Sequence, residues 1–178
     1  MFLTIITRCY KRPRMLAKCI TSLERQTYKD WQHITIVDEI GIGIPETFRR
    51  MAKRDWSDVQ GEYVYFLDDD NLLADVESVR WLRDITQGGT DMLIFRAEIG
   101  DKILPDRAHW GWPPVFRHID LGCAIVQRDV FFQAAKSFGA RYEGDYDYLS
   151  AAYKLAKTHD WLNRCVMRAQ QVSHGAPE

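Results

Sequence analysis

The first half of the chain alternates short apolar segments with amphipathic ones, and this alternation constrains the fold more than any other feature. Four apolar segments have the length and composition of buried strands: residues 2–7, 33–37, 63–67 and 91–97. Apolar residues recur at helical spacing in the segments between them: residues 13–23, 45–54 and 76–85. Strand and helix signals that alternate in this way predict an α/β fold with a mainly parallel sheet and helices on both faces.

The second half of the chain has a less regular pattern. Residues 100–118 contain prolines and tryptophans, which indicate a long loop or a short hairpin. We expect strands at 119–127 and 162–172, and helices at 128–138 and 143–159. There is no internal repeat or linker, and 178 residues are enough for one domain with a substantial core.

Composition and charge limit the classes of function. Hydrophobic residues make up 46% of the chain and charged residues 28%, which is typical of globular proteins. The net charge of −1 gives no basic field for nucleic acid or an anionic membrane. There is no apolar run of transmembrane length and no signal-peptide layout at the start. Four scattered cysteines without C-x-x-C spacing favour a reducing compartment, so we expect a cytoplasmic protein.

Polar side chains follow three of the predicted strands at the points where these strands end. Residues 7–10 follow the first strand, Asp38 the second, and Asp68, Asp69 and Asp70 the third. Ligands of such sheets bind beyond the carboxyl ends of the strands. Three adjacent carboxylates repel one another, and a divalent cation with a preference for oxygen ligands would neutralise them. The alternative is a solvated turn with an acidic helix cap.

Four stretches of the sequence resemble the family 2 glycosyltransferases, which are nucleotide-sugar-dependent enzymes of the GT-A fold. These stretches are LTIITRCYKRPRMLAKCITSLERQTYKDW (3–31), ITIVDE (34–39), GEYVYFLDDDN (61–71) and EGDYDYL (143–149). They are similar to that family's opening strand and helix, its second strand, its D-x-D motif and the helix start that supplies its catalytic base. The resemblance implies a Rossmann-like sheet in one GT-A domain over residues 1–178, with a donor half at 1–98 and a small mixed acceptor half at 99–178.

The resemblance also implies a donor site for a UDP-sugar. Asp38 would accept a hydrogen bond from the uracil ring, and Tyr10 would stack on that ring or shape its pocket. Asp68 would hold the ribose or a metal-bound water. The donor-binding residues implied in this way are Thr7, Arg8, Tyr10, Asp38, Arg50, Asp68 and Asp69.

A metal ion, Mn²⁺ or Mg²⁺, is part of the same expectation. Asp70 would coordinate the ion between the two phosphates, where it stabilises the leaving diphosphate by electrostatics. His174, in the segment VSHG, would be a second ligand, or alternatively a surface residue.

The catalytic base implied by the resemblance is Asp145. It begins a predicted helix, and the helix dipole favours an ionised carboxylate at that position. Its role would be to accept the proton of the acceptor hydroxyl, because an alcohol is a poor nucleophile near neutral pH. Asp147 and Glu143 are rivals for this role, and plain helix capping is the alternative for Asp145.

The function implied is that of a metal-dependent inverting glycosyltransferase, which moves a sugar from a UDP-sugar to a hydroxyl of a glycan, a lipid or a protein-linked acceptor. A nucleotide-sugar-binding module without turnover is one alternative. A haloacid-dehalogenase-like phosphatase is another, although that class carries its D-x-D motif on the first strand. Two departures from the family are Asp38-Glu39-Ile40-Gly41 in place of Asp-Asp-Gly-Ser and the lack of Ala-Arg-Asn around Arg49. The sequence leaves the sugar, the acceptor and a homo-oligomer open.

Overall fold

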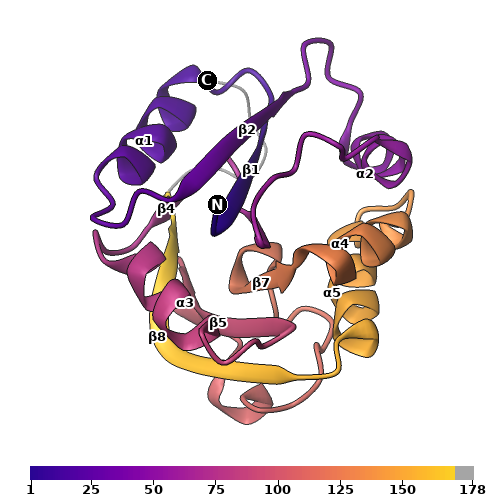
Figure 1. Ribbon diagram of the computed structural model, residues 1–178. Coiled ribbons are helices and arrows are strands. Elements are labelled where there is room, and N and C mark those ends of the chain that lie inside the picture. Colours follow the sequence, from indigo (N-terminus) through magenta and orange to yellow (C-terminus); the bar gives the residue numbers. More distant parts are fainter. Residues whose placement is uncertain (171–178) are drawn as a thin grey trace.

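The computed structural model describes residues 1–170 as a curled mixed sheet flanked by helices (Figure 1). The strands are β1 (Leu3–Cys9), β2 (Trp31–Val37), β3 (Tyr63–Phe66), β4 (Asn71–Leu73), β5 (Met92–Ile99), β6 (Lys102–Leu104), β7 (Ala124–Gln127) and β8 (His159–Ala169). The helices are α1 (Pro13–Glu24), α2 (Ile44–Lys53), α3 (Ser78–Thr86), α4 (Arg128–Ala134) and α5 (Gly144–Leu155), with short 3₁₀ turns η1 (Arg107–His109), η2 (Leu121–Cys123) and η3 (Ala135–Ser137). Of the helices in this part of the chain, none has the length and apolar character needed to cross a bilayer.

The strands are arranged in the order β2-β1-β3-β7-β5-β8-β4, and β6 pairs with β5. β1 runs parallel to both β2 and β3, as the alternation of strands and helices predicts. β7, however, lies between β3 and β5 and runs antiparallel to both, and β4 runs antiparallel to β8. The prediction of a mainly parallel sheet was therefore wrong, because a strand from the less regular half enters the middle of the sheet.

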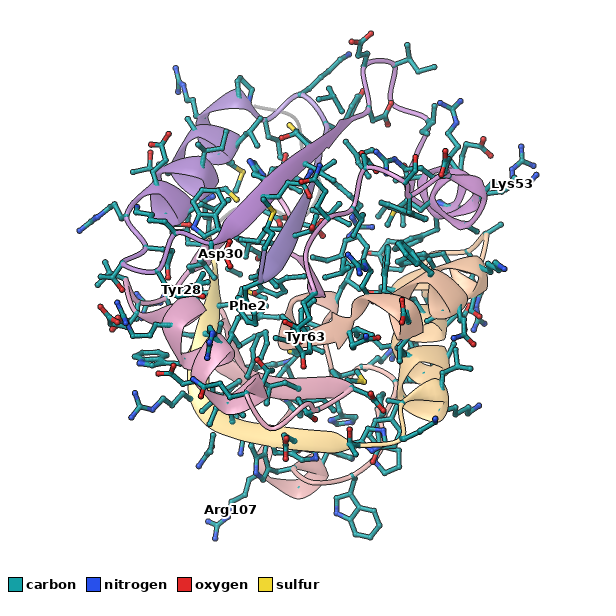
Figure 2. All side chains as sticks on the ribbon, viewed as in Figure 1. Phe2, Tyr28, Asp30, Lys53, Tyr63 and Arg107 are labelled. Carbon is teal, nitrogen blue, oxygen red and sulfur yellow. The ribbon has the colours of Figure 1, made fainter. Side chains whose placement is uncertain are left out.

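The central strands are buried on both faces, which explains their continuous apolar sequences. All four residues of β3 and six of the seven in β1 are buried. At the start of β1, the ring of Phe2 packs between those of Tyr28 and Tyr63, at centroid distances of 6.1 and 5.6 Å (Figure 2). These contacts anchor the beginning of β1, whereas Arg8 and Cys9 at its other end line a cavity.

A cluster of aromatic rings fixes the helices on one side of the sheet. Figure 1 shows α1 and α3 on the left and α2, α4 and α5 on the right. Phe66 of β3 contacts the rings of Phe131, Phe138 and Tyr148, with centroids 5.6 to 6.1 Å apart. Phe138 also stacks on Phe48 of α2 at 5.5 Å. Because these rings come from α2, α4 and α5, they hold the start of α5 close to the end of β3.

Candidate functional site

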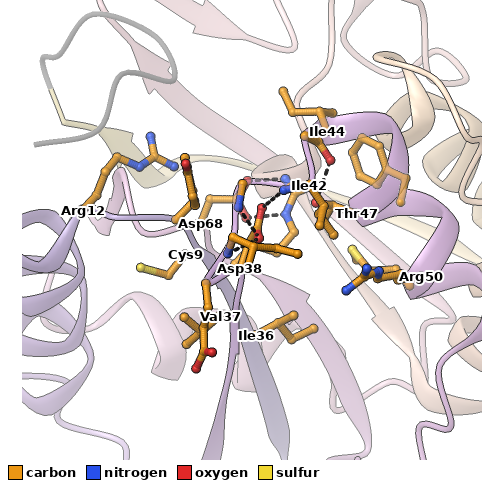
Figure 3. A pocket seen from close by; sticks show the side chains of 18 of the residues that line it. Cys9, Arg12, Ile36, Val37, Asp38, Ile42, Ile44, Thr47, Arg50 and Asp68 are labelled. Atoms are coloured by element: carbon orange, nitrogen blue, oxygen red, sulfur yellow. Dashed lines mark hydrogen bonds and ion pairs between the residues drawn. The ribbon is translucent and has the colours of Figure 1, made fainter.

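A cavity of about 970 Å³ opens at the carboxyl ends of β1, β2 and β3 (Figure 3). Its walls come from the end of β1 and the loop that follows, from residues 38–43 and from one face of α2. Asp68 and Asp70, after β3, line a further part of it, and Tyr142 and Asp145 contribute from the start of α5. The volume lies at the upper end of the range for small-molecule sites.

The cavity brings together most of the residues that the sequence singled out. Those that line it are Arg8, Tyr10, Asp38, Arg50, Asp68, Asp70 and Asp145. Thr7 and Asp69 are fully buried and are not among the lining residues. The hydroxyl of Thr7 donates to the carbonyl of Leu67 at 2.8 Å, and its donor-binding role stays a prediction, as does that of Asp69. His174 lies outside the described residues.

Arg8 and Asp68 form a bidentate ion pair in the cavity wall. Arg8 Nε donates to Asp68 Oδ1 at 2.7 Å, and Nη2 contacts Oδ2. The guanidinium carbon also lies 4.8 Å from the ring centroid of Phe48. Burial alone would lower the pKa of Arg8, but the charge and hydrogen bonds of Asp68 give a net upward shift. The cavity therefore holds a permanent positive charge next to the acidic run.

Arg12 holds the other two carboxylates of the acidic run. Its Nη1 donates to Asp70 Oδ2 at 2.8 Å and its Nε to Asp69 Oδ2 at 3.1 Å, while Nη2 contacts Asp69 Oδ1. Burial raises the pKa of Asp69, which makes this arginine the main compensation for its charge. Two guanidinium groups therefore offset two of the three adjacent carboxylate charges, and one negative charge remains. Sequence reasoning missed Arg12, although three like charges at a strand end signal a need for basic partners.

Asp70 fits the role of a metal ligand. Its side chain is 31% exposed and lines the cavity. A carboxylate has about four acceptor positions, so a cation can bind Asp70 in competition with the positively charged Arg12. Oxygen ligands suit Mn²⁺ and Mg²⁺, and a nucleotide-bound ion needs one or two carboxylates, since phosphates and water supply the rest.

Asp38 organises the loop between β2 and α2. Its carboxylate accepts hydrogen bonds from the backbone amides of Ile40, Gly41 and Ile42 at 3.2, 2.8 and 2.8 Å (Figure 3). Gly41 has a φ of +75°, and a Cβ at this position would lie 2.4 Å from the Tyr10 hydroxyl oxygen. The loop that follows Asp38 is thus folded back on its carboxylate and packed against Tyr10.

Asp145 lies at the start of α5 and faces the cavity. Its Oδ1 accepts a hydrogen bond from the amide of Tyr146 at 2.7 Å. Burial raises the pKa of the Asp145 carboxyl, and the Tyr146 bond and the Arg8 charge oppose this only in part. Asp147, in contrast, is paired with Arg141, whose Nε donates to its Oδ2 at 2.8 Å, and does not line the cavity. The geometry therefore favours Asp145 over Asp147 as a base.

Asp120 is a third carboxyl with a raised pKa near this site, after Asp69 and Asp145. Its Oδ1 accepts from the amide of Gly122 at 2.8 Å and caps η2. Burial raises the pKa of Asp120 to about 6, with contributions from the charges of Asp68 and Asp145. Asp120 is thus a half-buried neighbour of the cavity whose charge depends on pH near its pKa of about 6.

Comparison with family models and with curated proteins gave no match. Among solved structures, S. aureus TarS 1-349 has a TM-score of 0.73 at 15% identity, over 96% of this chain and 60% of that chain. The same protein in complex with UDP-GlcNAc has a TM-score of 0.71 at 14% identity, over 99% of this chain and 60% of that chain. The mannosyltransferase PcManGT from Pyrobaculum calidifontis, in complex with GDP-Man and Mn²⁺, has a TM-score of 0.65 at 10% identity, over 97% and 58%.

These similarities show that the chain has the fold of known nucleotide-sugar-binding proteins, one of which is a sugar transferase. The glycosyltransferase-like fold that the resemblance implied is thereby confirmed, while membership of family 2 stays a prediction. The chain spans about 60% of the length of TarS 1-349.

Proposed function

We propose that this protein transfers a sugar from a UDP-sugar to an acceptor hydroxyl, with the aid of a divalent cation and with inversion at the anomeric carbon. One observation carries the proposal: Asp68 and Asp70, after β3, and the separate carboxylate of Asp145 line a single cavity. The first two can hold a diphosphate through a cation, and Asp145 can serve as a base. Nucleotide sugars bound to proteins of the same fold support this reading.

The donor would lie along the ends of β1 and β2. Tyr10 and the loop folded on Asp38 form the wall of the cavity that would receive the uracil ring, and Asp38 retains acceptor capacity beside its three backbone bonds. Figure 3 shows Arg12 and Arg50 on opposite sides of Asp38. Arg50 is 61% exposed and pairs with Glu46 at 3.2 Å, an interaction that is weak at a surface, so its guanidinium can turn to a phosphate.

A cation held by Asp70 would neutralise the charge that develops on the diphosphate as it leaves. Asp145 would take the proton of the acceptor hydroxyl as the oxygen attacks the anomeric carbon. Its upward-shifted pKa makes it a stronger base than an exposed aspartate while it is ionised. Attack from the side opposite the leaving diphosphate inverts the configuration of that carbon.

The test compares UDP binding and sugar transfer in four proteins: wild type, Asp70→Asn, Asp145→Asn and Asp147→Asn. Calorimetry with UDP is run with Mn²⁺ and with a chelator, and UDP release from a panel of UDP-sugars measures turnover. We expect UDP binding that needs both Mn²⁺ and Asp70. Asp145→Asn should bind UDP normally and lose at least about 100-fold in turnover, whereas Asp147→Asn, two residues away on the same helix, should keep both.

Each result has a distinct meaning. Absent UDP binding, or binding that ignores Mn²⁺ and Asp70, would overturn the donor site. Equal loss of turnover in both helix variants would overturn the role of Asp145. Metal-dependent UDP binding without turnover in the wild type, over the whole panel, would support a binding module in place of an enzyme.

A further inference from the structure

The segment between β6 and η2 gathers three metal-ligating side chains that the proposed function does not use. Asp106 Oδ1 lies 2.7 Å from His109 Nδ1, and Asp106 Oδ2 lies 2.7 Å from His118 Nδ1. The two imidazole rings stack with centroids 3.8 Å apart and an interplanar angle of 29°. One ligand atom from each residue lies within 4.8 Å of the other two, and within residues 1–170 no other set of His, Cys, Asp and Glu side chains meets this criterion.

We propose that Asp106, His109 and His118 bind a divalent transition-metal ion of the Zn²⁺ type, at a site separate from the donor cavity. Two imidazole nitrogens and a carboxylate oxygen are the donor set that borderline ions such as Zn²⁺ prefer, with water in the fourth position. Hard ions such as Mg²⁺ prefer a set made of oxygen alone. For an ion to bind here, both rings carry their proton on Nε2 and direct the lone pair of Nδ1 toward the ion.

The cluster is already arranged for such an ion. Both Nδ1 atoms face the same carboxylate, and the backbone amide of His109 donates to Asp106 Oδ1 at 3.1 Å, which fixes the orientation of that carboxylate.

The surroundings leave room for the ion to enter. The side chains of His109, Asp106 and His118 are 29, 38 and 40% exposed. Arg96 interacts electrostatically with Asp106, but its guanidinium lies on the ring of Trp110, at 3.9 Å from the centroid, and donates to Asn163 Oδ1 at 3.0 Å and to the carbonyl of Pro105. Arg107, which lies within the same turn, extends away from the ribbon (Figure 2).

An ion at this site would clamp a loop that packs against Tyr146, the residue next to the cavity-lining Asp145. His118 lies nine residues after His109, so the ion would close a loop over residues 109–118. Within the closed loop, the ring of Phe116 packs edge-on against Tyr146 at 5.6 Å, directly beside Asp145. The clamp would thereby shape the acceptor side of the cavity. This consequence rests on the proposed function, whereas the binding of the ion does not.

The test titrates Zn²⁺ into the full chain in the Asp70→Asn background without nucleotide, so that its outcome is independent of donor binding. We expect one Zn²⁺ per chain by calorimetry and intense visible absorption bands when Co²⁺ is used in its place. Adding His118→Asn should weaken Zn²⁺ binding by more than about 100-fold, since even the loss of a partner that only orients a ligand weakens binding 10- to 100-fold. His159→Asn, at a histidine whose ring contacts Tyr153 and not the cluster, is the matched control and should leave Zn²⁺ binding unchanged.

Asparagine at position 118 can still donate a hydrogen bond to Asp106, so this variant separates metal ligation from loop stability. Without metal, the thermal midpoint of the double variant should match that of the Asp70→Asn parent. Zn²⁺ should raise the midpoint of the parent and leave that of the double variant unchanged. Stoichiometric Zn²⁺ binding that survives His118→Asn, or no Zn²⁺ binding by the parent, would overturn the proposal.

Discussion

Arg12 offers the sharpest test of how the acidic run is neutralised, because its removal should change two properties in opposite directions. The substitution is Arg12→Gln, which keeps much of the side-chain volume and removes the charge. Arg12 is 15% exposed and bonds both the fully buried Asp69 and the cavity-lining Asp70. The loss of one partner of a buried ion pair typically costs about 3 kcal/mol, because the other charge is left uncompensated.

We therefore expect the free energy of unfolding at pH 7 to fall by about 3 kcal/mol in urea titrations of Arg12→Gln. The loss should shrink toward acid pH. Burial already raises the pKa of Asp69, and without Arg12 this pKa rises further, so protonation removes the penalty as the pH falls through it. The control is Arg80→Gln, whose ion pair with Glu77 is at the surface, and there we expect a change of about 0.5 kcal/mol or less.

The affinity for Mn²⁺, in contrast, should rise in Arg12→Gln. A cation that binds Asp70 competes with the Arg12 guanidinium, and a hydrogen bond to a charged group contributes about 1.5 kcal/mol. Its removal should raise the affinity for Mn²⁺ about tenfold, measured by calorimetry without nucleotide. Equal or weaker Mn²⁺ binding by Arg12→Gln would refute the competition, and unchanged stability would refute the dependence of Asp69 on this arginine.

Two further substitutions test the loop after β2 and the carboxyl of Asp120 near the cavity. Gly41→Ala should weaken UDP binding, since the φ of Gly41 is +75° and a Cβ there would lie 2.4 Å from the Tyr10 hydroxyl oxygen. Gly43→Ala is the control for backbone strain alone, because Gly43 has a φ of +80° and a Cβ there would have no atom within 4 Å. In calorimetry, Gly43→Ala should bind UDP better than Gly41→Ala. Asp120 has a folded pKa of about 6 against a usual value of 3.8, so its ionisation favours the unfolded state and stability should fall as the pH rises from about 4 to about 6. Asp120→Asn keeps the bond to the backbone amide and should remove that fall in urea titrations across this range, and a fall of the same size in the variant would contradict the assignment.

Local sequence patterns predicted the elements of this fold better than their pairing. The apolar runs at the beginning of the chain became β1, β2 and β3. β1 and β3 are buried on both faces and therefore need apolar residues at nearly every position, whereas β2 lies at the edge of the sheet and is partly exposed. The position of β7 between β3 and β5 could not be predicted in this way, because it depends on contacts between distant parts of the chain. β4 was missed because three residues directly after an acidic run carry no periodic signal.

The candidate site shows the same division between local and distant information. Asp38, Asp68 and Asp70 could be grouped from sequence, since the carboxyl ends of neighbouring parallel strands share one edge of the sheet. Arg12 escaped notice because its partners lie 57 and 58 residues away. The cluster of Asp106, His109 and His118 escaped for a different reason, since its spacing fits no regular element and only the folded loop brings the rings together.

The arrangement of charges around Asp70 also predicts the order in which ligands enter the cavity. A cation that arrives alone must take Asp70 from Arg12 and leaves this guanidinium without one of its two partners. A cation that arrives with a diphosphate brings new acceptor oxygens, to which Arg12 and the nearby Arg8 can turn. We therefore expect Mn²⁺ to bind about tenfold more tightly in the presence of UDP, and UDP to gain the same factor from Mn²⁺, because linked binding is reciprocal. Uridine, which lacks phosphate, should leave the affinity for Mn²⁺ unchanged in calorimetry. If uridine raised the affinity for Mn²⁺ as much as UDP does, the coupling would come from the base and the loop at Asp38. Arg12 would then have no part in it.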